Sequence, residues 1–384
     1  MTLGIFTVMT AELLPVGLLT PAAADLAVSE GTAALMVTVP GLVAALAAPL
    51  VTVRAAGADR RALLVGLLLL AAAANLVSAL AGHLAVVLAA RVLLGVAIGG
   101  FWALAGGLAP RLVPAGAVGR ATAVIFGGVS AASVLGVPAG TLLTERAGWR
   151  WAFAATGLLA LLAAAALRTL LPRLPGRGAG TGAEPSPAGR SGAGTLLALP
   201  RRNRRVRAGL LLTLALVTGH FLAYSFVRPL LTDRSGISGS LLGALLLGYG
   251  VAGVAGNFLA GSRAARSPGR TLAVIAAALG TVLLAGFLLG GSAIAGAGLL
   301  LLWGLAYGGV SVALQSWFMA AAPDDVETAT GLNVSVFCLA IALGALLGGF
   351  LVDAYSLDTV LLAGAALTLA AFPVAVLSGR NDPS

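Results

Sequence analysis

Twelve apolar stretches, each about the length of a membrane span, constrain the fold of this 384-residue chain more than any other feature. A membrane-spanning helix needs about 20 apolar residues, and only helices and closed barrels can span a bilayer. Charged residues make up 9% of the chain, against about 25% in a soluble domain. The predicted spans are 3–21, 33–53, 62–80, 84–108, 118–143, 151–171, 208–231, 240–262, 271–290, 294–320, 329–352 and 359–377.

The positions of the arginines indicate how these spans are oriented. All basic residues of the chain are arginines, and basic loops stay on the cytoplasmic side of a membrane. Seventeen arginines follow even-numbered spans, and three lie in the opposite loops. We therefore expect both termini in the cytoplasm.

One long polar stretch, residues 172–207, separates the first six spans from the last six. It is rich in Pro, Gly and Ser, which predicts a flexible cytoplasmic linker. Its arginine-rich end is expected to lie on anionic lipid; nucleic-acid binding is disfavoured because no aromatic residues alternate with the arginines. The predicted organisation is a six-helix bundle over 1–171, this linker, a second six-helix bundle over 208–378 and a tail over 379–384.

The two halves carry a trace of internal duplication. The fourth span contains "GVAIGG" from Gly95, and the tenth contains "GLAYGG" from Gly304, 209 residues later. The same offset relates Gly140 to Gly349. This constant spacing predicts parallel repeats of the kind found in transporters, in which the substrate site lies between the halves.

Several motifs resemble those of the major facilitator superfamily, in particular its twelve-span drug:proton antiporters. They include "TAELLPVGLL" in the first span, "ARVLLGVAIGGFWAL" in the fourth, "FGGVSAASVLGVPAGTLL" in the fifth and "TGHFLAYSFVRPLL" in the seventh. The nearest resemblance is to bacterial efflux permeases for purine nucleosides, sugars and chloramphenicol. It implies an all-α protein of two pseudo-symmetric six-helix bundles in the bacterial inner membrane, working by alternating access.

The loop after the second span departs from the family pattern. The family reads similarly to G-x-L-x-D-R-x-G-R-R, whereas this chain has "PLVTVRAAGADRRALL". Arg54, Arg60 and Arg61 remain, Val53 replaces the usual acid, and Asp59 comes late. The resemblance makes the three arginines and Asp59 candidates for a motif that controls conformational change.

Glu12, in the middle of the first span, is the main candidate for function. A charged group at mid-membrane costs about 2.5–3.5 kcal/mol on insertion scales and is functional by default. A carboxyl whose surroundings alternate between dry and wet can pick up and release a proton. A Glu held in a fixed ion pair is the alternative. Arg91 in the fourth span falls at a similar depth and is the expected partner, either tuning Glu12 or bridging to it statically.

A polar stripe is predicted in the seventh span. His220, Tyr224 and Arg228 follow one another at intervals of four and would share one helix face, directed at the cavity. His220 is a second candidate for proton coupling because imidazole titrates near neutral pH; a structural His bonded to a neighbouring helix is the alternative. Pro229 is expected to bend or end the helix.

Drug-sized sites are mostly apolar and aromatic with a few polar groups, which yields a set of candidate solute contacts. These are Phe101, Trp102, Phe221, Tyr224, Arg228, Gln315, Asn333 and Phe337. Cys338 stands where the family pattern has an amide.

A second set, Gly128, Gly136, Pro138 and Gly140 in the fifth span, forms the antiporter signature implied by the resemblance; its structural interpretation is small-residue packing between the halves.

These features predict proton-coupled efflux of a small organic solute. The alternatives are a uniporter or importer of a sugar or nucleoside, in which Glu12 recognises the solute, and a membrane receptor that does not transport. The chain has no G-x-x-x-x-G-K-[ST] phosphate loop, two His and one Cys, so we expect no enzyme activity, cofactor or metal. The expected partners are protons, the solute and lipid, with no nucleic acid, and the expected state is a monomer.

Overall fold

The computed structural model is built from helices throughout its described part, which comprises residues 1–54, 58–105, 108, 112–114, 124–125, 127–129, 131–174, 193–264 and 266–379. Twelve helices in this part are long and apolar enough to cross a membrane. Helix is the expected outcome because every backbone N–H and C=O within hydrocarbon must be hydrogen-bonded inside the segment. The twelve predicted spans are thereby confirmed.

The N-terminal half contributes the first six spans. Their helices are α1 (Thr2–Asp25), α2 (Glu30–Ala33) with α3 (Leu35–Arg54), α4 (Arg60–Leu80), α5 (Leu84–Ala105), the π-helix η2 (Ala132–Gly136) with α8 (Val137–Ala147), and α9 (Trp149–Leu170).

The C-terminal half contributes the last six spans. Their helices are α11 (Arg204–Tyr224) with α12 (Val227–Pro229) and η4 (Leu230–Arg234), α13 (Ser240–Ala264), α14 (Pro268–Leu289), α15 (Ala293–Gly308) with α16 (Val310–Ala321), α17 (Val326–Ala354) after the short η5 (Pro323–Asp325), and α18 (Leu357–Gly379).

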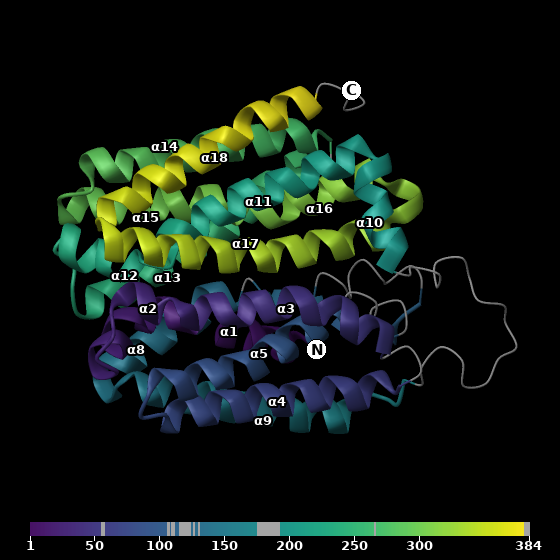
Figure 1. The fold of residues 1–384 in the computed structure, drawn as a ribbon, viewed down its shortest axis with the longest axis horizontal. Helices are drawn as coiled ribbons and strands as arrows, with labels where there is room; N and C mark the ends of the chain where they lie inside the picture. The colour runs from purple at the N-terminus through teal and green to yellow at the C-terminus, as the bar shows by residue number, and fades with distance from the viewer. Residues whose placement is uncertain are drawn as a thin grey trace, which may run out of the picture.

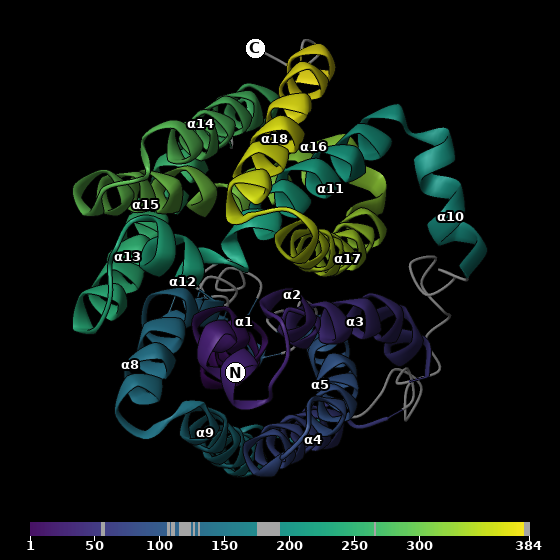
Figure 2. The same cartoon turned by 60° about the vertical axis from the view of Figure 1, so that its left-hand side comes forward.

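Each half packs its spans in the same order. The second and fourth spans pair as α3 with α5, and their counterparts pair as α13 with α15. The third and sixth spans pair as α4 with α9, and their counterparts as α14 with α18. Figures 1 and 2 show the result as two separate bundles with parallel long axes. The same pairing in both halves is the arrangement expected of a duplicated six-helix unit.

Helices of the two halves meet in three places: α2 and α3 against α17, α8 with its preceding π-helix against α13, and α1 against α12. In the first place, Gly31 of α2 meets Gly349 of α17, since a Cβ added at Gly349 would lie 2.7 Å from the Gly31 carbonyl oxygen. Beside it, the Asp353 carboxylate accepts hydrogen bonds from the Ser29 hydroxyl (2.5 Å) and from the Gly31 N–H (3.1 Å). This end of the interface is therefore closed.

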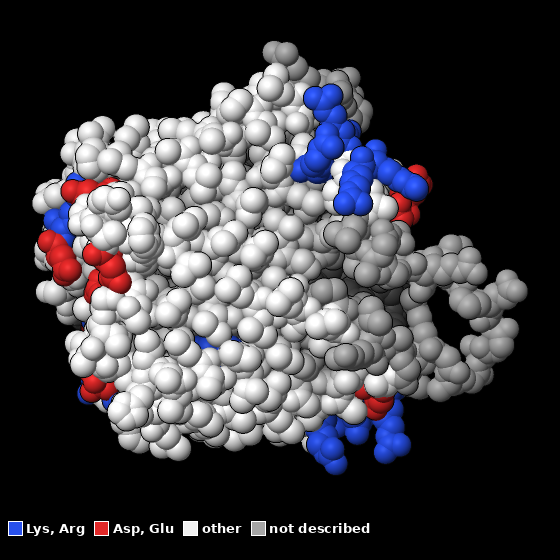
Figure 3. Space-filling view, in the orientation of Figure 1, with Lys and Arg blue, Asp and Glu red and all other residues white. Residues whose placement is uncertain are grey.

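Charged side chains gather at the two ends of the molecule. Figure 3 shows most of them on either side of a broad band in which only a small basic patch is visible, as a membrane-embedded surface requires. Arg111, Arg120, Arg380 and residues 175–192 of the predicted linker lie outside the described residues.

The linker prediction needs one correction. Residues Ala193–Arg202 form helix α10, so this part of the segment is not free of regular structure. Asn203 follows it and caps the seventh span, accepting hydrogen bonds from the N–H groups of Arg205 and Val206. An Asn side chain in this position satisfies donors that the first helical turn leaves unpaired.

Candidate functional site

Glu12 lies about midway along α1 with 3% of its surface exposed. Within the described residues, no hydrogen bond or ion pair joins its carboxylate to another group. Leu13 and Val16, which lie beside it on α1, pack in one apolar cluster with residues of the C-terminal half. Glu12 is thus a buried acid on the helix that packs at the junction of the two bundles.

Arg91 does not pair with the Glu12 carboxylate, contrary to the expectation from the sequence. Its Nη1 donates to the carbonyl oxygen of Ala11 (3.0 Å), and its guanidinium lies 4.5 Å above the ring of Phe153. Its Nε and Nη2 are buried without a hydrogen-bond partner. Arg91 therefore reaches the backbone beside Glu12 and keeps two of its nitrogens without an acceptor.

Four rings of the C-terminal half form a column. Tyr307 stacks on His220 with ring centroids 3.3 Å apart, His220 on Tyr224 at 4.8 Å, and Tyr224 on Tyr249 at 4.8 Å. We call this set, in the order Tyr307, His220, Tyr224, Tyr249, the ring column. Helices α15, α11 and α13 supply it, so it fixes three spans relative to one another.

Two further aromatic side chains meet the column edge-on. Phe221 contacts His220 with planes at 89°, and Trp303 contacts His220, Tyr224 and Tyr249 nearly at right angles. The Trp303 indole N–H also donates to Nδ1 of His220 (3.0 Å). Because an indole nitrogen only donates, Nδ1 is the acceptor and the imidazole proton lies on Nε2.

Tyr249, Trp303 and Tyr307 are site residues that sequence reasoning missed. A usable signal exists in the tenth span, where Trp303 and Tyr307 are four residues apart, the same spacing as His220 and Tyr224 in the seventh. Aromatic pairs at this spacing lie on one helix face.

The predicted stripe of the seventh span holds only in part. His220 and Tyr224 do share a face, but α11 ends at Tyr224, and Arg228 lies in the separate helix α12. Pro229 has no N–H to donate, and its ring excludes a regular helix around Ser225 four residues earlier. The Arg228 guanidinium consequently turns to the other half and donates to the carbonyl oxygen of Gly17 (3.0 Å).

The other predicted solute contacts do not join the column. Phe101 is 1% exposed in the core of the N-terminal bundle, where Trp102 packs against the same cluster. Asn333 accepts a hydrogen bond from the Thr213 hydroxyl (2.8 Å), which ties α17 to α11. Phe337 is partly buried against the C-terminal core, and Gln315 is exposed on α16.

The glycines of the fifth span pack inside their own bundle, not between the halves as predicted. A Cβ at Gly136 would collide with the Thr10 hydroxyl, one at Gly140 with Leu14, and one at Gly128 with the Thr2 carbonyl oxygen. All three contacts are with α1. Pro138, also buried, lies in the first turn of α8. These glycines therefore bring the fifth span up against the helix that carries Glu12.

The loop after the second span is tied to the end of the sixth. Asp59 accepts hydrogen bonds from the N–H groups of Leu174 (2.9 Å) and Arg61 (3.1 Å), while Arg61 donates to the carbonyl oxygen of Leu171 (3.1 Å). The Leu174 N–H lowers the pKa of the Asp59 carboxyl below its usual value. The N–H of Arg60 donates to the Leu174 carbonyl oxygen (3.0 Å); the side chain of Arg54 lies outside the described part of the chain.

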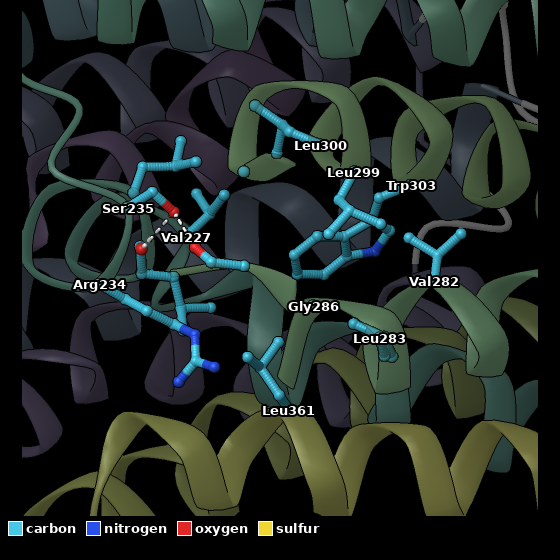
Figure 4. A pocket seen from close by; sticks show the side chains of 14 residues that line it. Val227, Arg234, Ser235, Val282, Leu283, Gly286, Leu299, Leu300, Trp303 and Leu361 are labelled. Atoms are coloured by element: carbon cyan, nitrogen blue, oxygen red, sulfur yellow. Dashed lines mark hydrogen bonds between the residues drawn. The ribbon is translucent and has the colours of Figure 1, made fainter. Parts of the chain in front are cut away.

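A small cavity lies in the C-terminal bundle (Figure 4). Trp303, Arg234, Ser235 and Leu361 are among the residues that line it. Its volume of about 50 Å³ is far below the ~300 Å³ of a small-molecule site. It is too small to hold an organic solute. The described residues contain no group of three or more His, Cys, Asp or Glu placed to hold a metal ion.

Comparison with known proteins decides the family. The sequence profile described as Major Facilitator Superfamily matches residues 1–345. The chain belongs to the major facilitator superfamily. It is therefore a multi-pass membrane transporter, and the resemblance noted in the sequence is confirmed.

Individual relatives cover nearly the whole chain. The purine ribonucleoside efflux pump NepI of Escherichia coli (strain K12) is 34% identical over 358 residues, 93% of this chain and 87% of its own. The transcription regulatory protein OpdE of Pseudomonas aeruginosa is 35% identical over 376 residues, 98% and 92% of the two chains.

Solved structures of the superfamily share the fold. A bacterial homologue of the human lysosomal transporter Spinster, in an inward-facing and occupied conformation, superposes with a TM-score of 0.78 at 16% identity, covering 99% of this chain and 95% of its own. The human organic anion transporter MFSD10 does so with a TM-score of 0.65 at 20% identity, covering 97% of each chain.

Proposed function

We propose that this transporter exports a small organic solute in exchange for protons by alternating access. The observation that carries the proposal is Glu12, an acid at mid-membrane that is 3% exposed and lies on the helix whose Leu13 and Val16 pack with the opposite half. An unpaired carboxylate there is expensive, whereas a protonated carboxyl is not. Proton binding and release at Glu12 would therefore follow whichever side of the membrane has access to it.

Arg91 supports Glu12 in this scheme. Its guanidinium binds the carbonyl oxygen of Ala11 next to Glu12 and keeps two nitrogens, Nε and Nη2, without an acceptor. A rearrangement during transport that brought the carboxylate and the guanidinium together would favour the deprotonated acid. His220 is a weaker proton carrier, because a second proton on Nδ1 would have to displace the Trp303 N–H.

Purine ribonucleosides are the solutes to test first. The relative NepI is named as a purine ribonucleoside efflux pump and matches 93% of this chain.

The arginine asymmetry supports a bacterial inner-membrane location with both termini in the cytoplasm. In that orientation Ser29, Gly31 and Asp353 close the extracellular end.

Proton movement in everted membrane vesicles tests the exchange. A respiratory substrate establishes the proton gradient, and nucleosides and drugs are then added to vesicles holding wild type, Glu12→Gln or the control Glu145→Gln. Glu145 is an exposed acid at the end of α8. We expect a transported solute to dissipate the gradient for wild type and the control but not for Glu12→Gln. Equal responses of all three would remove the proton role from Glu12.

Two other functions predict different results. A uniporter or importer would move solute without dissipating the gradient. A regulatory receptor, which the name of the relative OpdE favours, would bind solute without any flux. Radiolabelled solute uptake with and without a gradient separates the three.

A further inference from the structure

The ring column concentrates a scarce residue type at one place. The chain has four tyrosines among 384 residues, and three of them, Tyr224, Tyr249 and Tyr307, belong to the column. Aromatic residues are 5% of the sequence, so general core composition does not account for this stack.

The column is held rigidly on its flanks. The hydrogen bond from Trp303 fixes the rotation of the His220 ring, and both Phe221 and Trp303 meet that ring in T-shaped contacts. Edge-to-face and offset-stacked arrangements are the favoured geometries of aromatic pairs. The plane of each ring is thus set by its neighbours.

The two ends of the column differ. Tyr249 is 6% exposed and packed into the C-terminal core. Tyr307 is only partly buried, and its described ring contacts are the stack with His220 and the edge contact with Phe221. The column is therefore closed at Tyr249 and open at Tyr307.

A side chain able to form hydrogen bonds, Glu12, lies near the open end of the column. Helix α1 of the other half brings Glu12 to this level, because its neighbours Leu13 and Val16 belong to the apolar cluster against which Tyr307 packs. A molecule that covers the Tyr307 ring would thus have an acid close by. A flat ring with N–H groups and ring nitrogens along its edge matches both features, since its face can stack and its edge can bond a carboxyl.

We propose that Tyr307 is the platform on which a planar nitrogen heterocycle of the nucleobase class stacks as a fifth ring, its edge turned to Glu12. This inference rests on the proposed transport function and names the class of its solute. His220, Tyr224, Tyr249 and Trp303 act as positioning residues that hold the platform in its plane.

Equilibrium binding without any gradient tests the platform. Wild type, Tyr307→Phe, Tyr307→Leu and Tyr355→Leu are purified in lipid nanodiscs and titrated with adenosine, guanosine, cytidine, uridine and ribose. Tyr355 is a control because it is 71% exposed at the end of α17. At least one nucleoside should bind wild type, and ribose should bind far more weakly. Tyr307→Leu should raise the dissociation constant by about 5- to 150-fold, the range measured for base–aromatic stacking, whereas Tyr307→Phe and Tyr355→Leu should change it little.

A spectroscopic readout covers the case in which Tyr307→Leu does not fold. The ultraviolet absorbance of the bound nucleoside should fall on binding to wild type, because stacked bases absorb less. The proposal is overturned by an unchanged spectrum, by full affinity in Tyr307→Leu, by ribose binding as well as the nucleosides do, or by no nucleoside binding at all. The titration needs no proton gradient, so it tests the binding platform separately from the proton exchange. If nucleoside binding depends on Tyr307 but the vesicles show no proton exchange, only the proposed antiport is contradicted.

Discussion

The indole N–H of Trp303 donates to Nδ1 of His220 across 3.0 Å, and the two residues lie on different spans, α15 and α11. This bond leaves the imidazole in one tautomer inside an otherwise aromatic cluster. It also leaves the buried Nε2 of His220 without a hydrogen-bond partner in the described chain.

Trp303→Phe keeps a ring in place but removes this donor. Leaving the buried Nδ1 acceptor unpaired should lower the free energy of unfolding by about 1–3 kcal/mol and weaken nucleoside binding by loosening the column. Thermal unfolding and nanodisc titration measure the two effects. Trp151→Phe, at a position that is 62% exposed, should change neither. A Trp303→Phe protein as stable as wild type would show that the bond contributes nothing.

Arg91→Met should separate stability from transport. Burying a charge without an ionic partner costs free energy, and two nitrogens of Arg91 have no hydrogen bond to lose. We therefore expect an unfolding temperature at or above that of wild type together with lost proton exchange in vesicles. The exposed Arg168→Met is the control. Marked destabilisation with residual exchange would make Arg91 a structural residue.

Gly31→Ala should prevent closure at the end where Gly31 meets Gly349. The added Cβ would collide with the Gly349 carbonyl oxygen and the Asp353 carboxylate. Cys338, the single cysteine of the chain, reports the opening because it is buried between the halves with its carbonyl oxygen 3.0 Å from a Cβ built at Gly41. A membrane-impermeant thiol reagent added outside should label Gly31→Ala several-fold faster than wild type.

Gly82→Ala provides the matched control for that labelling experiment. Its Cβ would meet nothing within 4 Å, so its labelling rate should equal that of wild type. Equal rates for Gly31→Ala as well would mean that Gly31 does not control access to Cys338.

Asp59 should contribute a pH-dependent part of the stability. Its pKa is lowered by the Leu174 N–H, so the contribution is full above the unfolded-state value, near 3.9, and is lost as pH falls through the lower folded-state value. Asp59→Asn retains a capping oxygen but not the charge. The unfolding temperature of wild type should exceed that of Asp59→Asn between pH 5 and 7, and the difference should start to shrink near pH 4 and vanish below the lowered folded-state pKa. A difference independent of pH would contradict this assignment.

The spans and the buried acid were predictable because hydropathy and a lone charge are local signals. The contacts between residues were not predictable from the sequence. Most faces of these helices are apolar, so a hydropathy pattern does not distinguish residues in the core of one bundle from residues at the junction of the two bundles. Phe101 and Asn333 illustrate this limit, because each is taken up by packing within its own half. Arg228 was misplaced for a different reason: a helical projection across Pro229 assumes a continuous helix that the proline interrupts. Tyr307 and Tyr249 come together only through tertiary packing of separate spans.

The 209-residue offset between the halves also bears on the seventh span. It relates Ala11, next to Glu12, to His220, so the acid and the imidazole occupy nearly equivalent places in the first span of each repeat. One repeat presents an acid at this level and the other a stack of rings, on a scaffold that is otherwise duplicated. A solute lying on the pseudo-twofold axis therefore meets unlike surfaces on its two sides. A bound molecule therefore has two distinct orientations about this axis, and only one of them places its matching groups against the acid and against the rings at the same time.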